Sequence, residues 1–149
     1  MNTAIVTHSV NETVEAARDF AAQLQRGDVV TLFGDLGSGK TKFVKGVCHA
    51  FHVRTEATSP SFVLLNRYEG IDHAGKELLL YHFDLYRVKT LSEIYDLGYE
   101  EFLQGSGICC IEWAELLENL LPQRRYDVRF SYGEEETERR IEISSVGDF

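Results

Sequence analysis

Eight consecutive residues have the types and spacing of a phosphate-binding loop: Gly34-Asp35-Leu36-Gly37-Ser38-Gly39-Lys40-Thr41. They match the pattern GxxxxGK[ST] at every fixed position, between an apolar run, Val29 to Phe33, and a helix-like pattern, Phe43 to Phe51. Glycines let the backbone curl until its N–H groups face one centre, and the start of the following helix adds about half a positive charge. The segment therefore predicts an anion-binding loop between a strand and a helix.

The end of this segment suits the metal complex of a nucleoside triphosphate. The Lys40 ammonium would contact the β- and γ-phosphates, and the Thr41 hydroxyl would bind the Mg²⁺ that bridges them. We therefore expect ATP or ADP with Mg²⁺ as cofactors. The residues expected to contact the nucleotide here are Asp35, Leu36, Gly37, Ser38, Gly39, Lys40, Thr41 and Lys42. The competing interpretation is a glycine-rich turn that binds nothing, and a phosphate-binding loop alone performs no hydrolysis.

Two carboxylates follow strand-like segments and are candidates for the chemical step. Asp84 ends a β-rich run and could bind Mg²⁺ through water or orient the attacking water, unless it is a structural carboxylate paired with Arg87. Glu112 ends an apolar run that begins at Gly107, the form of a buried parallel strand with an acid at its carboxyl end. We expect Glu112 to act beside Thr41 on the metal, with a structural role as the alternative, and Trp113 to lie near the nucleotide.

Two polar segments have both a functional and a structural interpretation. Ser9, Asn11 and Glu12 open the first helix-like segment, where Ser9 and Glu12 form a capping box and all three residues could also lie beside the nucleotide base. The loop Thr58-Ser59-Pro60-Ser61-Phe62 has three hydroxyls and a proline. It is either a switch that senses the γ-phosphate or a plain turn into the next strand.

The remaining patterns describe the elements that would position these residues. A first amphipathic helix is expected from the cap at Ser9 until Gly27. An antiparallel strand pair, two short helices, a further short helix and a hairpin should follow. The strand pair is expected at Phe62–Tyr68 and Leu78–Asp84, and the two short helices at Thr90–Gly98 and Tyr99–Leu103. The further short helix is expected at Glu115–Leu121, and the hairpin strands around Tyr126–Tyr132 and Ile141–Ile143. We interpret residues 1–149 as one α/β domain.

Composition limits the partners and the compartment. The formal net charge is −9, with 24 acidic against 15 basic residues, so the overall field repels RNA and anionic membranes. Any nucleic acid is then expected to be held by a partner. The three cysteines form no CxxC pair and have apolar neighbours, which indicates buried thiols in a reducing compartment. Without a signal pattern or a run of 18 apolar residues, we expect a cytoplasmic protein.

Several segments together resemble one protein family. GDLGSGKT, SPSF, YHFDLYR, LGYEEFL and CCIEW occur in the order and approximate spacing of the TsaE (YjeE) proteins, bacterial ATPases of tRNA threonylcarbamoyladenosine synthesis. The resemblance implies a phosphate-loop NTPase domain of three layers with a mixed, partly antiparallel sheet. It also implies slow ATP hydrolysis by the protein alone, and TsaB- and TsaD-type partners that carry the tRNA and modify its adenosine 37.

The same resemblance implies roles for single residues. Lys40 and Thr41 carry the phosphate and metal roles, Glu112 is the Mg²⁺-side acid, and Asp84 is needed for activity. The loop from Ser59 to Phe62 is a switch. Two other functions stay open: a small-molecule kinase, for which no long arginine-rich lid is evident, and a nucleotide-switched binding module with negligible turnover. A GTPase is disfavoured because the sequence contains no NKxD motif.

Overall fold

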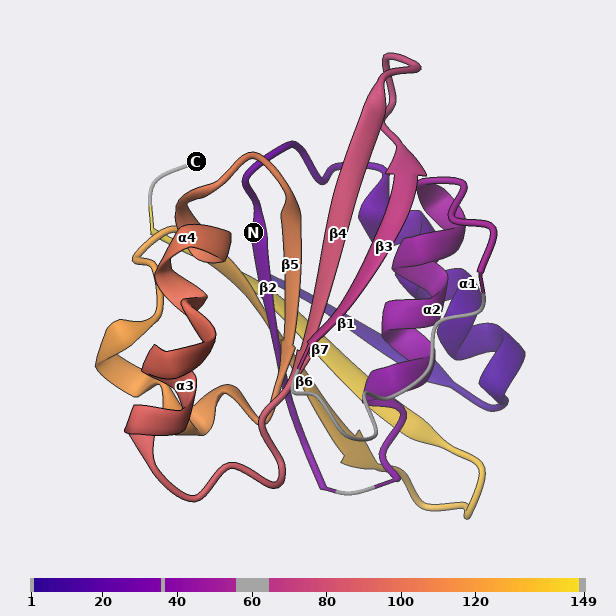
Figure 1. The fold of residues 1–149 in the computed structure, drawn as a ribbon. Coiled ribbons are helices and arrows are strands. Elements are labelled where there is room, and N and C mark those ends of the chain that lie inside the picture. Colours follow the sequence, from indigo (N-terminus) through magenta and orange to yellow (C-terminus); the bar gives the residue numbers. More distant parts are fainter. Residues whose placement is uncertain (1, 36, 56–64, 148–149) are drawn as a thin grey trace.

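One mixed sheet organises the computed structural model, which describes residues 2–35, 37–55 and 65–147. Over these residues seven strands pair in the order β1-β7-β6-β2-β5-β4-β3 (Figure 1). Their bounds are β1 Asn2–Thr7, β2 Val29–Phe33, β3 Leu65–Ile71, β4 Glu77–Asp84, β5 Ile108–Glu112, β6 Arg125–Tyr132 and β7 Arg139–Val146. The four central strands β6, β2, β5 and β4 run parallel, and the other pairs are antiparallel. The expected mixed, partly antiparallel sheet is confirmed.

The central strands β2 and β5 are apolar because both of their faces are covered. All five residues of β5 are buried, and so are the first four of β2. Alternate side chains enter different cores: Val30 and Cys110 pack on one face, and Val29 and Cys109 on the other. A strand with both faces buried has a continuous run of apolar residues, and this run indicated the positions of β2 and β5 in the sequence.

The first face carries the helices α1, Val10–Ala21, and α2, Lys40–Ala50 (Figure 1). Their apolar sides, with Phe20 on α1 and Phe43 and Val47 on α2, fill the larger core. Gly46 allows the close approach of the two helices, because a Cβ there would overlap the Val14 carbonyl oxygen and lie 2.6 Å from the Ala17 Cβ. The start of α1 is thereby held beside the start of α2.

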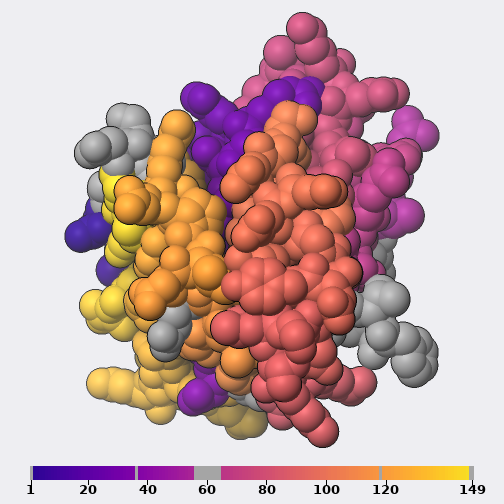
Figure 2. Space-filling view, turned by 60° about the vertical axis from the view of Figure 1, so that its left-hand side comes forward, coloured from indigo at the N-terminus to yellow at the C-terminus, as the bar shows by residue number. Residues whose placement is uncertain are grey.

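The second face carries short helices only. They are α3 Leu91–Leu97, α4 Tyr99–Gln104 and the 3₁₀ turns η1 Ala114–Leu116 and η2 Glu118–Leu120. Figure 2 shows these segments, coloured salmon to orange, covering this side of the molecule. Ile94, Tyr99 and Leu117 pack there on Phe83 and Ile111 of the sheet, completing three layers. The chain therefore has a three-layer α/β fold with helices on both faces of a mixed sheet.

The structure corrects some expected elements. The single helix expected over Glu115–Leu121 is wrong, because Trp113 adopts a left-handed turn and the chain continues as η1 and η2. The first helix ends at Ala21 rather than near Gly27. The strand β1 was not expected: its apolar residues Ala4-Ile5-Val6 form only a short run without alternation, residues 2–6 are largely exposed, and β7 pairs with them through the backbone.

The strand pair β3 and β4 is antiparallel as expected, although β3 continues to Ile71. The expected first residues of that strand, 62–64, lie outside the described residues. None of the helices in the described part of the chain combines the length and apolar character that a membrane span requires. The three thiols are free and buried, and burial raises the pKa of Cys48 and Cys109 to about 12, so these thiols stay protonated and unreactive.

Candidate functional site

The loop between β2 and α2 has the conformation that its glycines predict. Gly34, Gly37 and Gly39 all have positive φ, at 151°, 81° and 112°. A Cβ at Gly34 would lie 2.7 Å from Ser38 Oγ and 2.9 Å from the Phe130 Cβ, so no side chain fits there. The loop is therefore a tight concavity that opens onto the first turn of α2.

Lys40 lies at the start of α2 and is folded back over its own loop. Its ammonium donates to the Gly34 carbonyl oxygen at 2.5 Å and lies 3.5 Å from the centroid of the Trp113 ring. Only 4% of the residue is exposed. Burial lowers the pKa of Lys40, while Glu112, Glu115, Asp84 and Asp35 oppose this shift. The cation is held by the Gly34 carbonyl oxygen and an aromatic face at the mouth of the concavity, and the nearby carboxylates favour its charged form.

Trp113 supports this cation from a strained position. It is one of the two non-glycine residues with positive φ in the described part of the chain, at 60°, and its ring stacks on Tyr86 with centroids 4.9 Å apart. Such a backbone conformation costs about 1–3 kcal/mol and persists where its surroundings fix it. Trp113, which we expect to lie near the nucleotide, contacts Lys40 of the phosphate loop and lines the same cavity as this lysine.

The two candidate acids lie side by side at the carboxyl ends of β4 and β5. The parallel register pairs Asp84 with Glu112 directly. Glu112 is 3% exposed, and its Oε2 accepts the hydroxyl of Thr41 at 2.9 Å and faces Nε2 of His82 at 2.5 Å. Residues distant in the sequence thus meet at one edge of the sheet, next to the start of α2.

Asp84 is a partly buried carboxylate with few compensating contacts. Its Oδ1 accepts the backbone N–H of Tyr86 at 3.0 Å. Burial raises its pKa, the Tyr86 hydrogen bond opposes this, and the negative charge of Glu112 adds to it. A carboxylate with a raised pKa at the end of a strand is suited to accept a proton or hold a water molecule.

The oxygen donors fit Mg²⁺ bound together with a phosphate ligand. Within the described residues there is no cluster of three or more His, Cys, Asp or Glu side chains that could hold a metal alone. Mg²⁺ is usually held by one or two protein oxygens together with substrate phosphates and water. Thr41 Oγ1 and the Glu112 carboxylate, in contact at 2.9 Å, supply such a pair, with Asp84 next to them.

A cavity of about 620 Å³ joins these groups into one site. Of the residues predicted from the sequence, it is lined by Ser9, Gly37, Gly39, Lys40, Thr41, Lys42, Asp84 and Glu112. Asn11, Asp35 and Ser38 are not part of its lining, and the Ser38 side chain is buried beneath the loop. Leu36 and the switch segment from Thr58 to Phe62 lie outside the described residues.

The far wall of the cavity was missed by sequence reasoning. It consists of Val10 and Thr13 on α1 and of Glu136, Thr137 and Arg139 at the β6–β7 turn. The Arg139 guanidinium donates to the Glu136 carbonyl oxygen at 2.6 Å and stacks over Tyr132 at 4.5 Å, which fixes that turn. No local motif marks these residues, because they meet the phosphate loop only through the order of the strands.

Ser9 has the structural role that its pattern predicts. Its Oγ accepts the N–H of Glu12 at 3.1 Å, and the Glu12 carboxylate accepts the N–H of His8 at 3.0 Å. The reciprocal bond of the capping box thus shifts by one residue to His8. Ser9 also lines the cavity, so capping and a contact with a ligand are compatible at this position.

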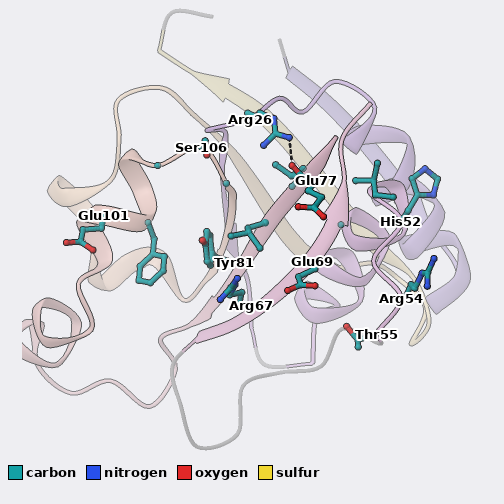
Figure 3. Close-up of a pocket in the computed structure, with 17 residues that line it drawn as sticks. Arg26, His52, Arg54, Thr55, Arg67, Glu69, Glu77, Tyr81, Glu101 and Ser106 are labelled. Atoms are coloured by element: carbon teal, nitrogen blue, oxygen red, sulfur yellow. Dashed lines mark hydrogen bonds between the residues drawn. The ribbon is translucent and has the colours of Figure 1, made fainter. Parts of the chain in front are cut away.

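A larger hollow of about 1300 Å³ lies beyond β3 and β4, away from the phosphate loop (Figure 3). Its lining mixes both charges, with the positive Arg54 and Arg67 and the negative Glu69, Glu77 and Glu101. Arg26 is already bonded to the Asp72 carboxylate at 2.9 Å and to the Glu77 carbonyl oxygen. The polar groups of this hollow do not converge on one centre, and the candidate site is the smaller cavity.

Comparisons with known proteins identify relatives of this chain. The family model described as "Threonylcarbamoyl adenosine biosynthesis protein TsaE" matches residues 7–141. Proteins described as tRNA threonylcarbamoyladenosine biosynthesis protein TsaE include one from Bacillus subtilis, 39% identical over 143 residues, covering 95% of this chain and 85% of that protein. Another, from Rickettsia bellii, is 41% identical over 123 residues, covering 82% of this chain and 81% of that protein.

A solved structure gives the same relationship in three dimensions. The crystal structure of Bacillus subtilis YdiB superposes with a TM-score of 0.75 at 35% identity, covering 99% of this chain and 87% of that one. The superposition therefore covers almost the whole of this chain.

Proposed function

The chain belongs to the TsaE family, which takes part in threonylcarbamoyladenosine biosynthesis, and we propose that it is a Mg²⁺-dependent ATPase in that pathway. In this proposal it acts in the cytoplasm with TsaB- and TsaD-type partners on tRNA position 37. The observation that carries the ATPase assignment is the convergence of Lys40, Thr41, Asp84 and Glu112 on one cavity beside the phosphate loop. These groups supply the cation, the metal ligands and the base that phosphoryl transfer to water needs.

Each side chain has a defined task in this proposal. Lys40 leaves the Gly34 carbonyl and the Trp113 ring and contacts the β- and γ-phosphates. Thr41 and Glu112 would hold Mg²⁺, which would supply positive charge beside the phosphate oxygens. Asp84, whose pKa is raised by burial, positions the attacking water and accepts its proton.

The far wall of the cavity is the proposed place for the ribose and base. It combines the exposed side chain of Val10 with Thr137 and the Arg139 guanidinium. Apolar and polar groups together suit the adenosine part of a nucleotide, whereas the triphosphate occupies the loop at the other end. ATP would therefore bridge α1 and the β6–β7 turn.

The acidic surface supports a role in which other proteins hold the tRNA. The net charge of −9 disfavours direct binding to a phosphate backbone. The paired arginines 124 and 125 are engaged with the protein itself, since Arg124 lies 3.7 Å from Asp28 and Arg125 donates to Asp127 at 2.9 Å. ATP hydrolysis would then drive or reset a partner complex that carries the RNA.

Fluorescence of Trp113, the only tryptophan in the sequence, tests the proposal. ATP, ADP and GTP are titrated with and without Mg²⁺ into the wild type, Lys40→Met and Lys76→Ala, a variant in an exposed turn far from the cavity. We expect a nucleotide-dependent change in the wild type and Lys76→Ala, and its loss in Lys40→Met. Phosphate release is measured in parallel, alone and with the partner proteins.

Three results would contradict the proposal. An equal fluorescence response in Lys40→Met would remove the phosphate loop from binding. Nucleotide binding without phosphate release under any condition, including the presence of partners, would leave a nucleotide-switched binding module. ADP formation that requires an added metabolite, with the γ-phosphoryl group found on that metabolite instead of released as phosphate, would indicate a kinase.

A further inference from the structure

His82 is a buried side chain that the proposed roles do not use. It lies on β4 two residues before Asp84, is 1% exposed, and points its Nε2 at Oε2 of Glu112 across the β4–β5 pair. The two atoms are 2.5 Å apart. A buried polar ring in direct contact with the proposed metal-side acid either only fills the core or also fixes the orientation of that carboxylate.

The contacts of the ring define which nitrogen carries the proton. Nδ1 of His82 is buried and makes no hydrogen bond within the described part of the chain. A proton on Nδ1 would be a buried donor without an acceptor, and it would leave the lone pair of Nε2 facing a carboxylate oxygen. A proton on Nε2 alone gives the Glu112 contact a donor and leaves only an unpaired acceptor at Nδ1.

The same carboxylate oxygen is therefore held twice. Glu112 Oε2 accepts the Thr41 hydroxyl at 2.9 Å and faces Nε2 of His82 at 2.5 Å, so two side chains from different elements fix one oxygen. None of the hydrogen bonds between described residues uses Oε1. The carboxylate cannot rotate freely, because turning it would break both bonds at once.

We propose that His82 is a positioning residue: its Nε2–H holds the Glu112 carboxylate in the orientation that binds the metal together with Thr41. This inference rests on the proposed Mg²⁺-dependent nucleotide binding. Partners that orient a metal ligand in this way typically change metal affinity by about 10- to 100-fold when they are replaced. A histidine that only fills the core would instead affect stability and all binding alike.

Two amide substitutions distinguish a positioning role from a core-filling role, because their side chains differ in length. The Nε2 of His82→Gln can occupy the place of the histidine Nε2 and donate to Glu112, whereas the shorter His82→Asn has the same amide but cannot reach it. His73→Gln is the matched control: His73 stacks on Phe51 at 4.8 Å and contacts the Ala21 carbonyl oxygen, far from the acids. Calorimetry measures the affinity for a non-hydrolysable ATP analogue in EDTA and at increasing Mg²⁺.

We expect His82→Asn to raise the Mg²⁺ concentration for half-maximal binding about tenfold or more, with nearly unchanged affinity in EDTA. His82→Gln should stay within about threefold of the wild type, and His73→Gln should match it. The inference is overturned if the two His82 variants behave alike, or if His82→Asn weakens binding equally with and without Mg²⁺. A wild type that shows no Mg²⁺ dependence would instead contradict the proposed function.

The wild-type protein provides a readout that does not depend on any variant folding. Nitrogen-15 NMR of the histidine rings distinguishes a protonated from an unprotonated ring nitrogen. We expect Nε2 of His82 to carry a proton, both before and after nucleotide binding. A proton on Nδ1 alone would mean that the ring does not donate to Glu112, and the positioning role would be rejected.

Discussion

The contact between α1 and α2 gives a prediction with two separate consequences. A Cβ at Gly46 would overlap the Val14 carbonyl oxygen and lie 2.6 Å from the Ala17 Cβ. Non-bonded carbons pack at about 3.5–4.0 Å, so Gly46→Ala must push the helices apart by roughly 1 Å. Overpacking of this kind costs up to about 3 kcal/mol, because backbone atoms have to move.

The helix itself gains from the same substitution. Alanine is favoured over glycine inside a helix by about 1 kcal/mol, so the net loss is about 2 kcal/mol. For a domain of this size that corresponds to a fall in Tm of about 4–8 °C. Because Ser9, Val10 and Thr13 of the displaced helix line the cavity, nucleotide affinity should fall as well.

Thermal unfolding and nucleotide titration measure the two effects. His49→Ala is the control on the same helix, since His49 is exposed and its loss should change stability by no more than about 0.5 kcal/mol. A rise in Tm for Gly46→Ala would mean that helix propensity alone decides and that the helices are not in close contact. A fall in Tm with unchanged nucleotide affinity would refute the link between this contact and the cavity.

Two further predictions concern ionisable groups of the site. The nucleotide affinity of the wild type should decrease as pH rises through the lowered pKa of Lys40, because the neutral amine no longer attracts phosphate. Titrations over a pH series should show the same decrease in nucleotide affinity for the control variant Lys76→Ala. An affinity of Lys40→Met that does not change with pH would support the assignment of this pH dependence to Lys40. Asp84→Asn should raise Tm at neutral pH while it lowers phosphate release by about a hundredfold. The raised pKa means that folding disfavours the ionised Asp84, so the gain in Tm should shrink as pH falls toward that pKa; a gain that is constant with pH would contradict this.

The elements that the sequence predicted best are those with a strong local signal. The β2–loop–α2 unit and the buried strand β5 appear where their apolar runs and glycines indicate. The cap of α1 at Ser9 and the end of α3 at Gly98, with φ 76°, are also confirmed. In each case a few adjacent residues determine the conformation, and distant parts of the chain only add packing.

The missed elements lack such a local signal. Strand β1 is mostly exposed and is defined by its pairing with β7, and the two 3₁₀ turns follow from the left-handed conformation of Trp113. A tryptophan in that conformation is fixed by its surroundings, here Tyr86 and the Lys40 ammonium, and these contacts depend on the whole fold. Sequence patterns alone therefore could not replace the expected helix with turns.

For the acidic part of the site, the sequence predicted single residues but not the contacts between them. Asp84 and Glu112 were identified singly, each as an acid at the end of a strand, but the β4–β5 register places them opposite each other. That register also brings His82, two residues earlier on the same face of β4, against Glu112, which Thr41 holds from α2. His82 alone suggests a core residue, and Glu112 alone suggests a metal ligand. Their contact follows from strand order, and it makes the orientation of one carboxylate depend on three elements of the fold.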